Sequence, residues 1–250
     1  MTTGQDANDG DGWTAAVRER LDLGRLLPLG DAADGAWLAE RAATTALRRT
    51  AAGVPGAVLG RLRVALADPG SAEQPAVPPP PSALPPGLLR IEGDFAAVAG
   101  EPLPDVAERL RTALYAYAVD RLGLRVGEVD LRVTALLDRE PDSAPGGGAG
   151  DSVGAAEPFG SIPVVPRGTA AVVAAKVPGV AHLSGSLGAA VLVTTGHVRV
   201  ELATAPGRHP SEVVRAVSRA VSASLPSHPT VAVIVTAVDA TDGQAQRGPR

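Results

Sequence analysis

The chain has 250 residues, a formal net charge of −4 from 23 Lys+Arg and 27 Asp+Glu, and 45% hydrophobic residues. This hydrophobic content is enough for folded cores and excludes wholesale disorder, and the absence of cysteine excludes disulfides and thiol nucleophiles. No apolar run reaches the roughly 18 residues of a membrane-spanning helix. The acidic, glycine-rich start is unlike a signal peptide. We therefore expect a cytoplasmic protein.

Proline-rich and glycine-rich stretches divide the chain into two folded units. We predict an N-terminal tail with a short helix (1–30), a first unit (31–138) with a proline-rich insert (69–87), a flexible linker (139–167), a second unit (168–240) and a C-terminal tail (241–250).

Hydrophobic periodicity predicts the elements of each unit. In the first unit we expect a helix over 37–51, strands over 57–67 and 88–97, a helix over 104–122 and a strand over 126–137. In the second unit we expect a short helix over 169–176, strands over 180–184, 189–195 and 197–204, a helix over 210–225 and a strand over 229–239.

Three sequence features recur in the same order in both units. Val-Pro-Gly follows the first helix at 54–56 and 177–179, and each long helix begins near a proline, Pro104 or Pro210. The last strand of each unit carries Val-Thr-Ala, at 133–135 and 235–237. We interpret the chain as a tandem duplication.

Alternation of apolar and polar residues predicts sheets with one buried and one solvent-exposed face. The pattern is clear at 89–95, where Arg90, Glu92 and Asp94 are the polar set, and at 197–202, where His197, Arg199 and Glu201 are. With helices on one face of each sheet, the fold class is α+β, built from two related, mostly antiparallel sheets.

Residue patterns for catalysis or metal binding are weak. The serine turn at 184–188 lacks the glycine two residues before the serine that a nucleophile elbow requires. The four histidines show no ligand-pair spacing, and Glu92 with Asp94 is the typical pattern of a solvated strand face. We expect no catalytic, cofactor or metal site, and hence a protein that is not an enzyme.

Two features favour partner contacts. Arg208, Arg215 and Arg219 are spaced to share one face of the helix over 210–225, which predicts contact with an acidic partner or an anionic lipid. The prolines Pro78, Pro79, Pro80 and Pro81 favour an extended segment that an aromatic groove could bind. A plain spacer is the alternative for this insert.

The second unit resembles the alkaline shock protein family, which are bacterial envelope stress response proteins. The resemblance lies in residues 176–180 (KVPGV), 198–202 (VRVEL) and 231–238 (VAVIVTAV), and the first unit is similar to a diverged copy. It implies a non-catalytic α+β domain that self-associates or docks on membrane-associated partners, in a chain whose composition is typical of a GC-rich bacterium.

We therefore expect a non-enzymatic adaptor or scaffold that acts through protein–protein contacts, in the cytoplasm or at the inner face of the membrane. Its expected partners are a small membrane protein, a related stress-family protein or a second copy of itself. The alternative is a small-ligand or nucleic-acid binding module that uses the polar sheet faces. The near-balanced charge disfavours nucleic acid.

Overall fold

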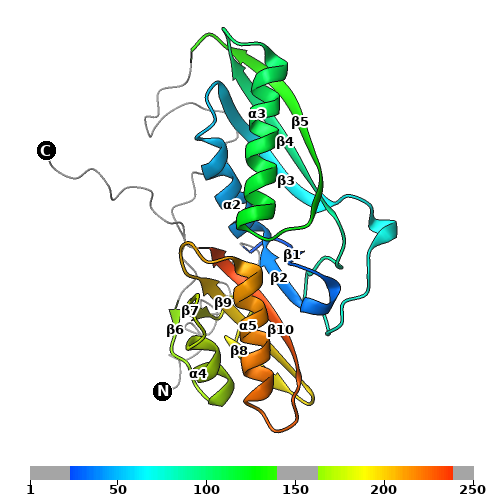
Figure 1. Cartoon of the computed structure of the whole chain (residues 1–250), viewed down its shortest axis with the longest axis vertical. Helices are drawn as coiled ribbons and strands as arrows, with labels where there is room; N and C mark the ends of the chain where they lie inside the picture. The colour runs from blue at the N-terminus through cyan, green and yellow to red at the C-terminus, as the bar shows by residue number, and fades with distance from the viewer. Residues whose placement is uncertain (1–22, 140–162, 239–250) are drawn as a thin grey trace, which may run out of the picture.

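The computed structural model describes residues 23–139 and 163–238. Figure 1 shows an elongated molecule with a three-stranded sheet at one end and a seven-stranded sheet at the other, both packed against helices. The α+β prediction is confirmed. Within the two described ranges, no helix combines the length and apolar character needed to cross a membrane.

We call the parts formed by residues 40–137 and 169–238 the first and second copies, after the interpretation of the sequence as a duplication. The first copy forms the three-stranded sheet, in the order β3-β4-β5. β3 and β4 pair antiparallel, whereas α3 carries the chain back across the sheet so that β4 and β5 pair parallel. The elements are α2 (Glu40–Ala51), β3 (Ala57–Leu66), β4 (Leu89–Val98), α3 (Leu103–Ala116), its π-helical extension η3 (Tyr117–Arg121) and β5 (Val126–Leu137).

The second copy has the same order of elements and the same pairing. β7 and β9 pair antiparallel, α5 crosses the sheet, and β9 and β10 pair parallel, while the added strand β8 pairs with β9. The elements are α4 (Thr169–Ala175), β7 (Val180–Ser184), β8 (Val191–Thr194), β9 (His197–Thr204), α5 (Pro210–Ala223) and β10 (Thr230–Val238).

The recurring sequence features have recurring structural roles. Gly56 and Gly179, which end the two Val-Pro-Gly turns, have φ of 76° and 98°, a backbone conformation that glycine adopts at little cost. In the two last strands the register shifts at the threonine of Val-Thr-Ala, so Thr134 and Thr236 are each the unpaired residue of a bulge. Each hydroxyl donates to the facing strand at 3.2 Å, to Phe95 O or to Leu202 O.

The chain before α2 differs from the predicted helix over 37–51. Residues 36–39 form β2 (Ala36–Ala39), which pairs antiparallel with β1 (Leu26–Pro28) and parallel with β10, and the helix begins only at Glu40. β2 is buried on both faces, and backbone pairing on both edges outweighs the helix propensity of its Ala and Leu. The predicted boundary at residue 31 thus lies inside a hairpin that belongs to the sheet of the second copy.

Other segments predicted as tails or linkers are only partly described. Pro163 and Val164, predicted within the flexible linker, form the short strand β6 against β7. Residues 1–22 of the predicted N-terminal tail, residues 140–162 of the linker and the C-terminal tail lie outside the described residues.

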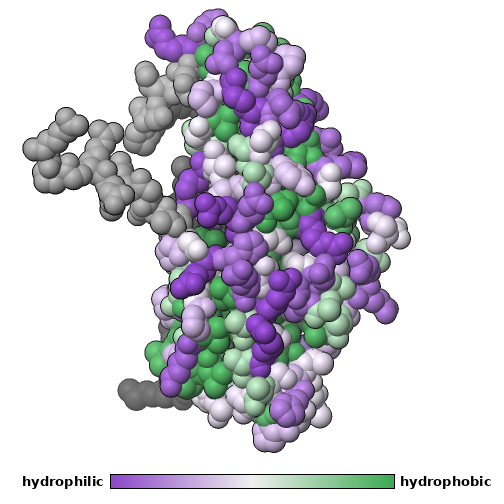
Figure 2. Space-filling model, viewed as in Figure 1, coloured by the Kyte–Doolittle hydropathy of each residue, from purple (hydrophilic) through white to green (hydrophobic). Residues whose placement is uncertain are grey.

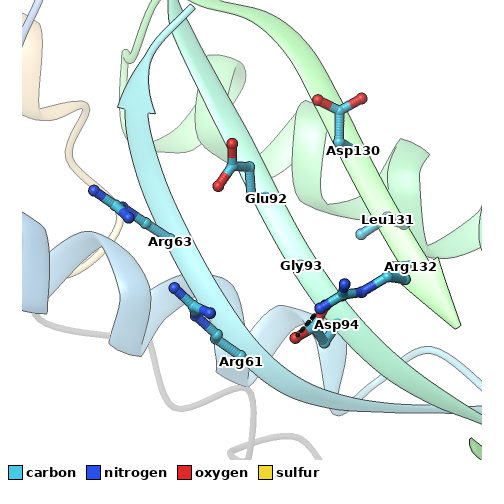
Figure 3. A pocket seen from close by; sticks show the side chains of 8 residues that line it. All are labelled: Arg61, Arg63, Glu92, Gly93, Asp94, Asp130, Leu131 and Arg132. Atoms are coloured by element: carbon cyan, nitrogen blue, oxygen red, sulfur yellow. Dashed lines mark hydrogen bonds and ion pairs between the residues drawn. The ribbon is translucent and has the colours of Figure 1, made fainter. Parts of the chain in front are cut away.

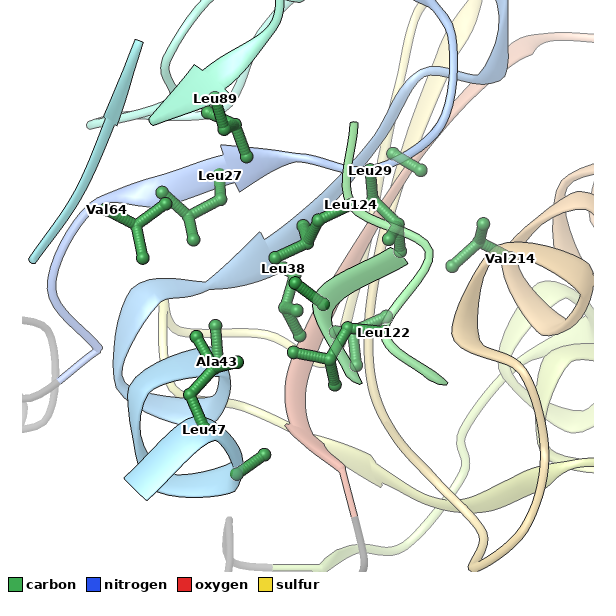
Figure 4. Close-up of a cluster of buried hydrophobic side chains, with 14 of the residues drawn as sticks. Leu27, Leu29, Leu38, Ala43, Leu47, Val64, Leu89, Leu122, Leu124 and Val214 are labelled. Carbon is green, nitrogen blue, oxygen red and sulfur yellow. The ribbon is translucent and has the colours of Figure 1, made fainter. Parts of the chain in front are cut away.

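One hydrophobic core runs through both copies. Leu38 of β2, Leu122 and Leu124 after α3, and Val214 of α5 lie in the same buried cluster (Figure 4). Arg25 connects the start of β1 with α2 and β3 beside this core. Its guanidinium donates to both carboxylate oxygens of Glu40, at 3.0 and 2.9 Å, and to Val64 O. Burial raises the pKa of Glu40, but the stronger combined effect of Arg25 lowers it.

The alternation at 197–202 predicts that one face of the seven-stranded sheet is exposed to solvent. In the structure this face, which carries Trp37 and Glu201, is buried. Trp37, Ile234 and Ala232 form a second buried cluster there, covered by Val77 of the insert and Leu187 of the β7–β8 loop. Glu201 has a fully buried side chain, and its Oε2 accepts from Leu187 N at 2.9 Å. The β7–β8 loop, which folds back over this face, therefore reverses the expected exposure of Glu201.

The two bulge threonines provide a matched test of this packing. Thr236 Oγ1 also lies 2.7 Å from Ser184 Oγ, and both residues are buried, whereas Thr134 is exposed. Thr236→Val is expected to cost about 1–3 kcal/mol in unfolding free energy, because it leaves the Ser184 hydroxyl without its partner. Thr134→Val is expected to cost less than about 0.5 kcal/mol. Urea unfolding followed by circular dichroism measures both, and equal losses would contradict this account of the bulges.

Candidate functional site

The three arginines predicted to form one contact face have different surroundings in the structure. Arg215 donates to both carboxylate oxygens of Asp34, at 2.8 and 2.9 Å, and so ties α5 to the turn between β1 and β2. Arg219 Nε donates to Arg215 O at 3.2 Å. Arg208 precedes α5 and lines a groove together with residues of α2 and η3. Arg215 therefore serves the fold, and the three do not form one free surface.

The proline-rich insert packs onto the first hairpin. Leu26 N donates to Ser82 O at 3.0 Å, Leu84 N donates to Leu26 O at 2.8 Å, and Trp37 Nε1 donates to Leu84 O at 3.1 Å. Pro80 is buried, while Pro78, Pro79 and Pro81 are exposed at its tip. The insert is therefore part of the folded structure. Neither sequence interpretation, a docking segment or a plain spacer, included this packing.

The other residues considered for chemistry have structural surroundings. Ser184 and Ser186 are buried in the sheet and its turn, and His209 Nδ1 lies 2.7 Å from Ser211 Oγ. Burial lowers the pKa of His197. Across the described ranges, no group of three or more His, Asp or Glu side chains is placed to hold a metal ion.

The outer edge of β5 is the clearest candidate for a binding site. β5 ends the order β3-β4-β5, so over its twelve residues it pairs with β4 alone among the strands of residues 23–139 and 163–238. At its start Arg111 Nε donates to Val129 O at 3.2 Å, which shows that Val129 directs its backbone to the open edge. Because backbone direction alternates along a strand, Leu131 and Val133 present their N–H and C=O groups to the same edge. An open edge of this length is a template for another strand.

The opposite edge of the same sheet is better protected. Arg48 Nη1 donates to Gly60 O at 2.7 Å, and Arg25 Nη2 donates to Val64 O at 2.5 Å, so two carbonyl groups of β3 are occupied. β5 lacks such cover beyond Val129 in the part of the chain that is described.

The face of this sheet away from the helices carries many charged side chains, and Figure 3 shows Arg132 paired with Asp94 among them. Arg132 Nε lies 3.0 Å from Asp94 Oδ1, and Arg90 pairs with Glu128 and with Asp130. A shallow hollow of about 310 Å³ lies among these side chains. Glu92 and Asp94, the acid pair considered in the sequence, are part of this charged face.

Apolar side chains flank the open edge on the helix side. Val133 and Leu136 of β5 are 37% and 64% exposed, whereas Val235, which has the place of Val133 in the second copy, is fully buried. Figure 2 shows that over most of the face in view hydrophobic and hydrophilic residues are interleaved, with a larger hydrophobic area over α4. The open backbone edge, its charges and these apolar residues together form what we call the β5 edge: Val126–Leu137.

Comparison with known proteins gives no match: no protein-family model, curated protein or solved structure is significantly similar to the chain.

The sequence predicted that residues 126–137 form a strand but did not predict that its outer edge is a candidate binding site. The signal for its exposure is weak, because residues 126–137 and 230–238 have the same Val-Thr-Ala pattern but opposite surroundings.

The Asp34–Arg215 pair predicts a pH-dependent contribution to stability. The hydrogen bond from Arg215 holds the pKa of Asp34 below its usual 3.8, so the contribution is present above that value and is lost as the pH falls through the lowered pKa. Arg215→Gln is expected to lower the unfolding free energy by about 1 kcal/mol at neutral pH, since the arginine is half exposed. The difference from wild type, measured by urea unfolding at several pH values, should shrink in acid. A difference that stays constant with pH would contradict the pairing, and Asp34→Asn is the reciprocal control.

Trp37 tests whether the insert is part of the folded structure. Its side chain is 1% exposed and packs between β10 and the insert. Trp37→Ala is expected to destabilise by about 3–5 kcal/mol. Trp37→Phe loses the bond to Leu84 O and some volume, and is expected to destabilise by about 1–2 kcal/mol. Thermal and urea unfolding give both values, and a loss near zero for both variants would show that the insert is not packed there.

Proposed function

We propose that this protein acts through protein–protein contacts, and that two molecules of it form a dimer in which the β5 edge of one chain pairs with the β5 edge of the other. The observation that carries the proposal is the open backbone edge beside exposed Val133 and Leu136. Strand addition at such an edge supplies backbone hydrogen bonds, and the side chains beside it supply specificity.

The second copy supports this use of the edge. β10 has the position of β5, and its outer edge accepts β2 in parallel pairing at Val233, Ile234 and Val235. This side of the duplicated unit therefore accommodates an additional strand without disturbing its own sheet. In the first copy the corresponding position is open among the described residues.

The sequence of β5 is complementary to itself. If two β5 strands pair antiparallel with Leu131 opposite Leu131, Asp130 faces Arg132 of the partner subunit on the charged side of the sheet. Val129 then faces Val133 of the partner subunit on the helix side. Two opposite-charge pairs and two apolar pairs result from one two-fold axis, as expected of an isologous interface. Arg111 releases Val129 O in this arrangement.

The wider function stays a prediction that rests on the resemblance to the alkaline shock protein family. On that basis the proposed role is a non-enzymatic adaptor or scaffold of the bacterial envelope stress type, placed in the cytoplasm or at the inner face of the membrane. A small membrane protein or a related stress-family protein is the proposed further partner.

The alternative, binding of a ligand or nucleic acid on the polar sheet faces, has less support. On the charged face of the first copy most charges pair with each other, and Arg61, Arg63 and Glu92 are the ones for which no ion pair is found in the described part of the chain. The unpaired charges sum to about one positive charge, which gives a weak field for a polyanion.

A charge-swap pair of variants tests the dimer. Asp130→Arg places like charges opposite each other at both pairs and is expected to shift the chain to monomer at concentrations where wild type is dimeric. The double variant D130R/R132D restores opposite charges and is expected to recover the dimer. Arg111→Ala frees Val129 O and is expected to strengthen it. Sedimentation velocity over a range of concentrations measures all of them.

Each variant has a defined contradictory result. A wild-type chain that is monomeric at high concentration, or a D130R/R132D variant no more dimeric than D130R, would overturn the proposed pairing. Because these side chains are exposed surface pairs, the fold is expected to survive, and circular dichroism of each variant checks this.

A further inference from the structure

A groove of about 560 Å³ lies between the two copies. One wall is formed by α2 and η3 of the first copy, and the other by the loop before α5 and the end of β10 in the second copy. None of its lining residues belongs to the β5 edge, so the groove is a separate candidate. Its volume is within the range of small-molecule binding sites.

The groove is lined by three arginines whose side chains have no ion pair or hydrogen bond within the described ranges. They are Arg49 of α2, Arg121 of η3 and Arg208 before α5, and all three are exposed. Asp120 is the single carboxylate of the lining, so with neutral histidine the charge is three minus one, or +2. By contrast, Arg25 and Arg215 are bound to carboxylates elsewhere. Cations gathered without counter-charges repel one another, and an anion relieves that repulsion.

A π-helical turn at the end of α3 forms part of one wall of the groove. A π-helical turn, Tyr117–Arg121, ends the long helix of the first copy, whereas α5 ends at Ala223 without one. Such turns are frequent at functional sites. This turn contributes Tyr117, Asp120 and Arg121 to the lining.

Gly123, two residues after this turn, lies where the two walls meet. Its φ is 74°, and a Cβ atom on it would lie 2.7 Å from His209 Cε1 and 3.1 Å from Ser211 Cβ, so a larger residue would disturb the approach of this segment to the start of α5. His209 is itself held by the contact with Ser211 Oγ. The arginines are therefore carried by backbone segments that pack directly against each other.

We propose that this groove binds a small phosphate-bearing anion, with the diphosphate group held by Arg49, Arg121 and Arg208. Guanidinium groups donate in a planar fork that matches two phosphate oxygens, and three of them suit a group with several negative charges. Tyr117 offers an aromatic surface for the organic part of such a ligand. The bounded volume and the single aromatic favour a small molecule over a nucleic acid strand, which requires a longer basic surface.

Calorimetric titration with inorganic pyrophosphate and, separately, with ADP tests the site. Wild type is expected to bind saturably at one site per chain. R121Q/R208Q is expected to weaken binding by at least about tenfold, because two charge-assisted contacts are lost. The matched control R61Q/R63Q removes the same charge from exposed arginines of the distant β3 face, and is expected to change the affinity by less than about twofold.

A second variant distinguishes the two sources of the phosphate group. Tyr117→Leu is expected to weaken ADP and to leave pyrophosphate unchanged if the ligand is an organic diphosphate. Equal affinity for both probes, with no effect of Tyr117→Leu, identifies an inorganic phosphate ligand at the same site. Far-UV circular dichroism confirms that each variant is folded.

Three results would overturn the proposal. They are the absence of saturable binding of either probe at millimolar concentration, an equal loss in R121Q/R208Q and R61Q/R63Q, and binding of a single-stranded oligonucleotide that is tighter than that of ADP and is lost in R121Q/R208Q. The last result would assign the groove to nucleic acid.

Discussion

Parallel pairing of β2 with β10 is the contact on which the rest of the structure depends. It places Ala36, Trp37 and Leu38 opposite Val233, Ile234 and Val235, and so joins the segment that opens the first copy to the last strand of the second. Adjacent residues of β2 point to opposite faces, so Leu38 enters the shared core while Trp37 faces the insert. α2 starts directly after β2, and its position follows from this pairing.

The two copies have the same strand pairing but different surroundings. The sheet of the second copy is extended by the β1–β2 hairpin and covered on its second face by Val77 and Leu187. The sheet of the first copy has a charged face and, in the described part of the chain, an open edge. One copy therefore provides burial for elements of the other, and the two candidate binding surfaces, the β5 edge and the groove, lie in the first copy and between the two copies.

Arginine has two roles in this protein, and the role of each side chain depends on whether a carboxylate lies beside it. Arg25 and Arg215 each form two hydrogen bonds with one carboxylate and connect segments far apart in the chain. Arg121 and Arg208 have no such carboxylate within the described residues and line a groove. The same side chain thus stabilises the fold where it is paired and is available for an anion where it is not.

The sequence by itself determined the repeated elements, since periodicity, the Val-Pro-Gly turns and the prolines at the helix starts are local signals that depend on near neighbours. The bounds of β5, β7 and β9 were predicted to the residue. Tertiary structure alone decided that 36–39 form a strand, that Glu201 is buried, that Arg215 binds Asp34 and that no other described strand pairs with the outer edge of β5. Each of these depends on which distant segment packs beside the residue, and the free energy of that burial outweighs local preference.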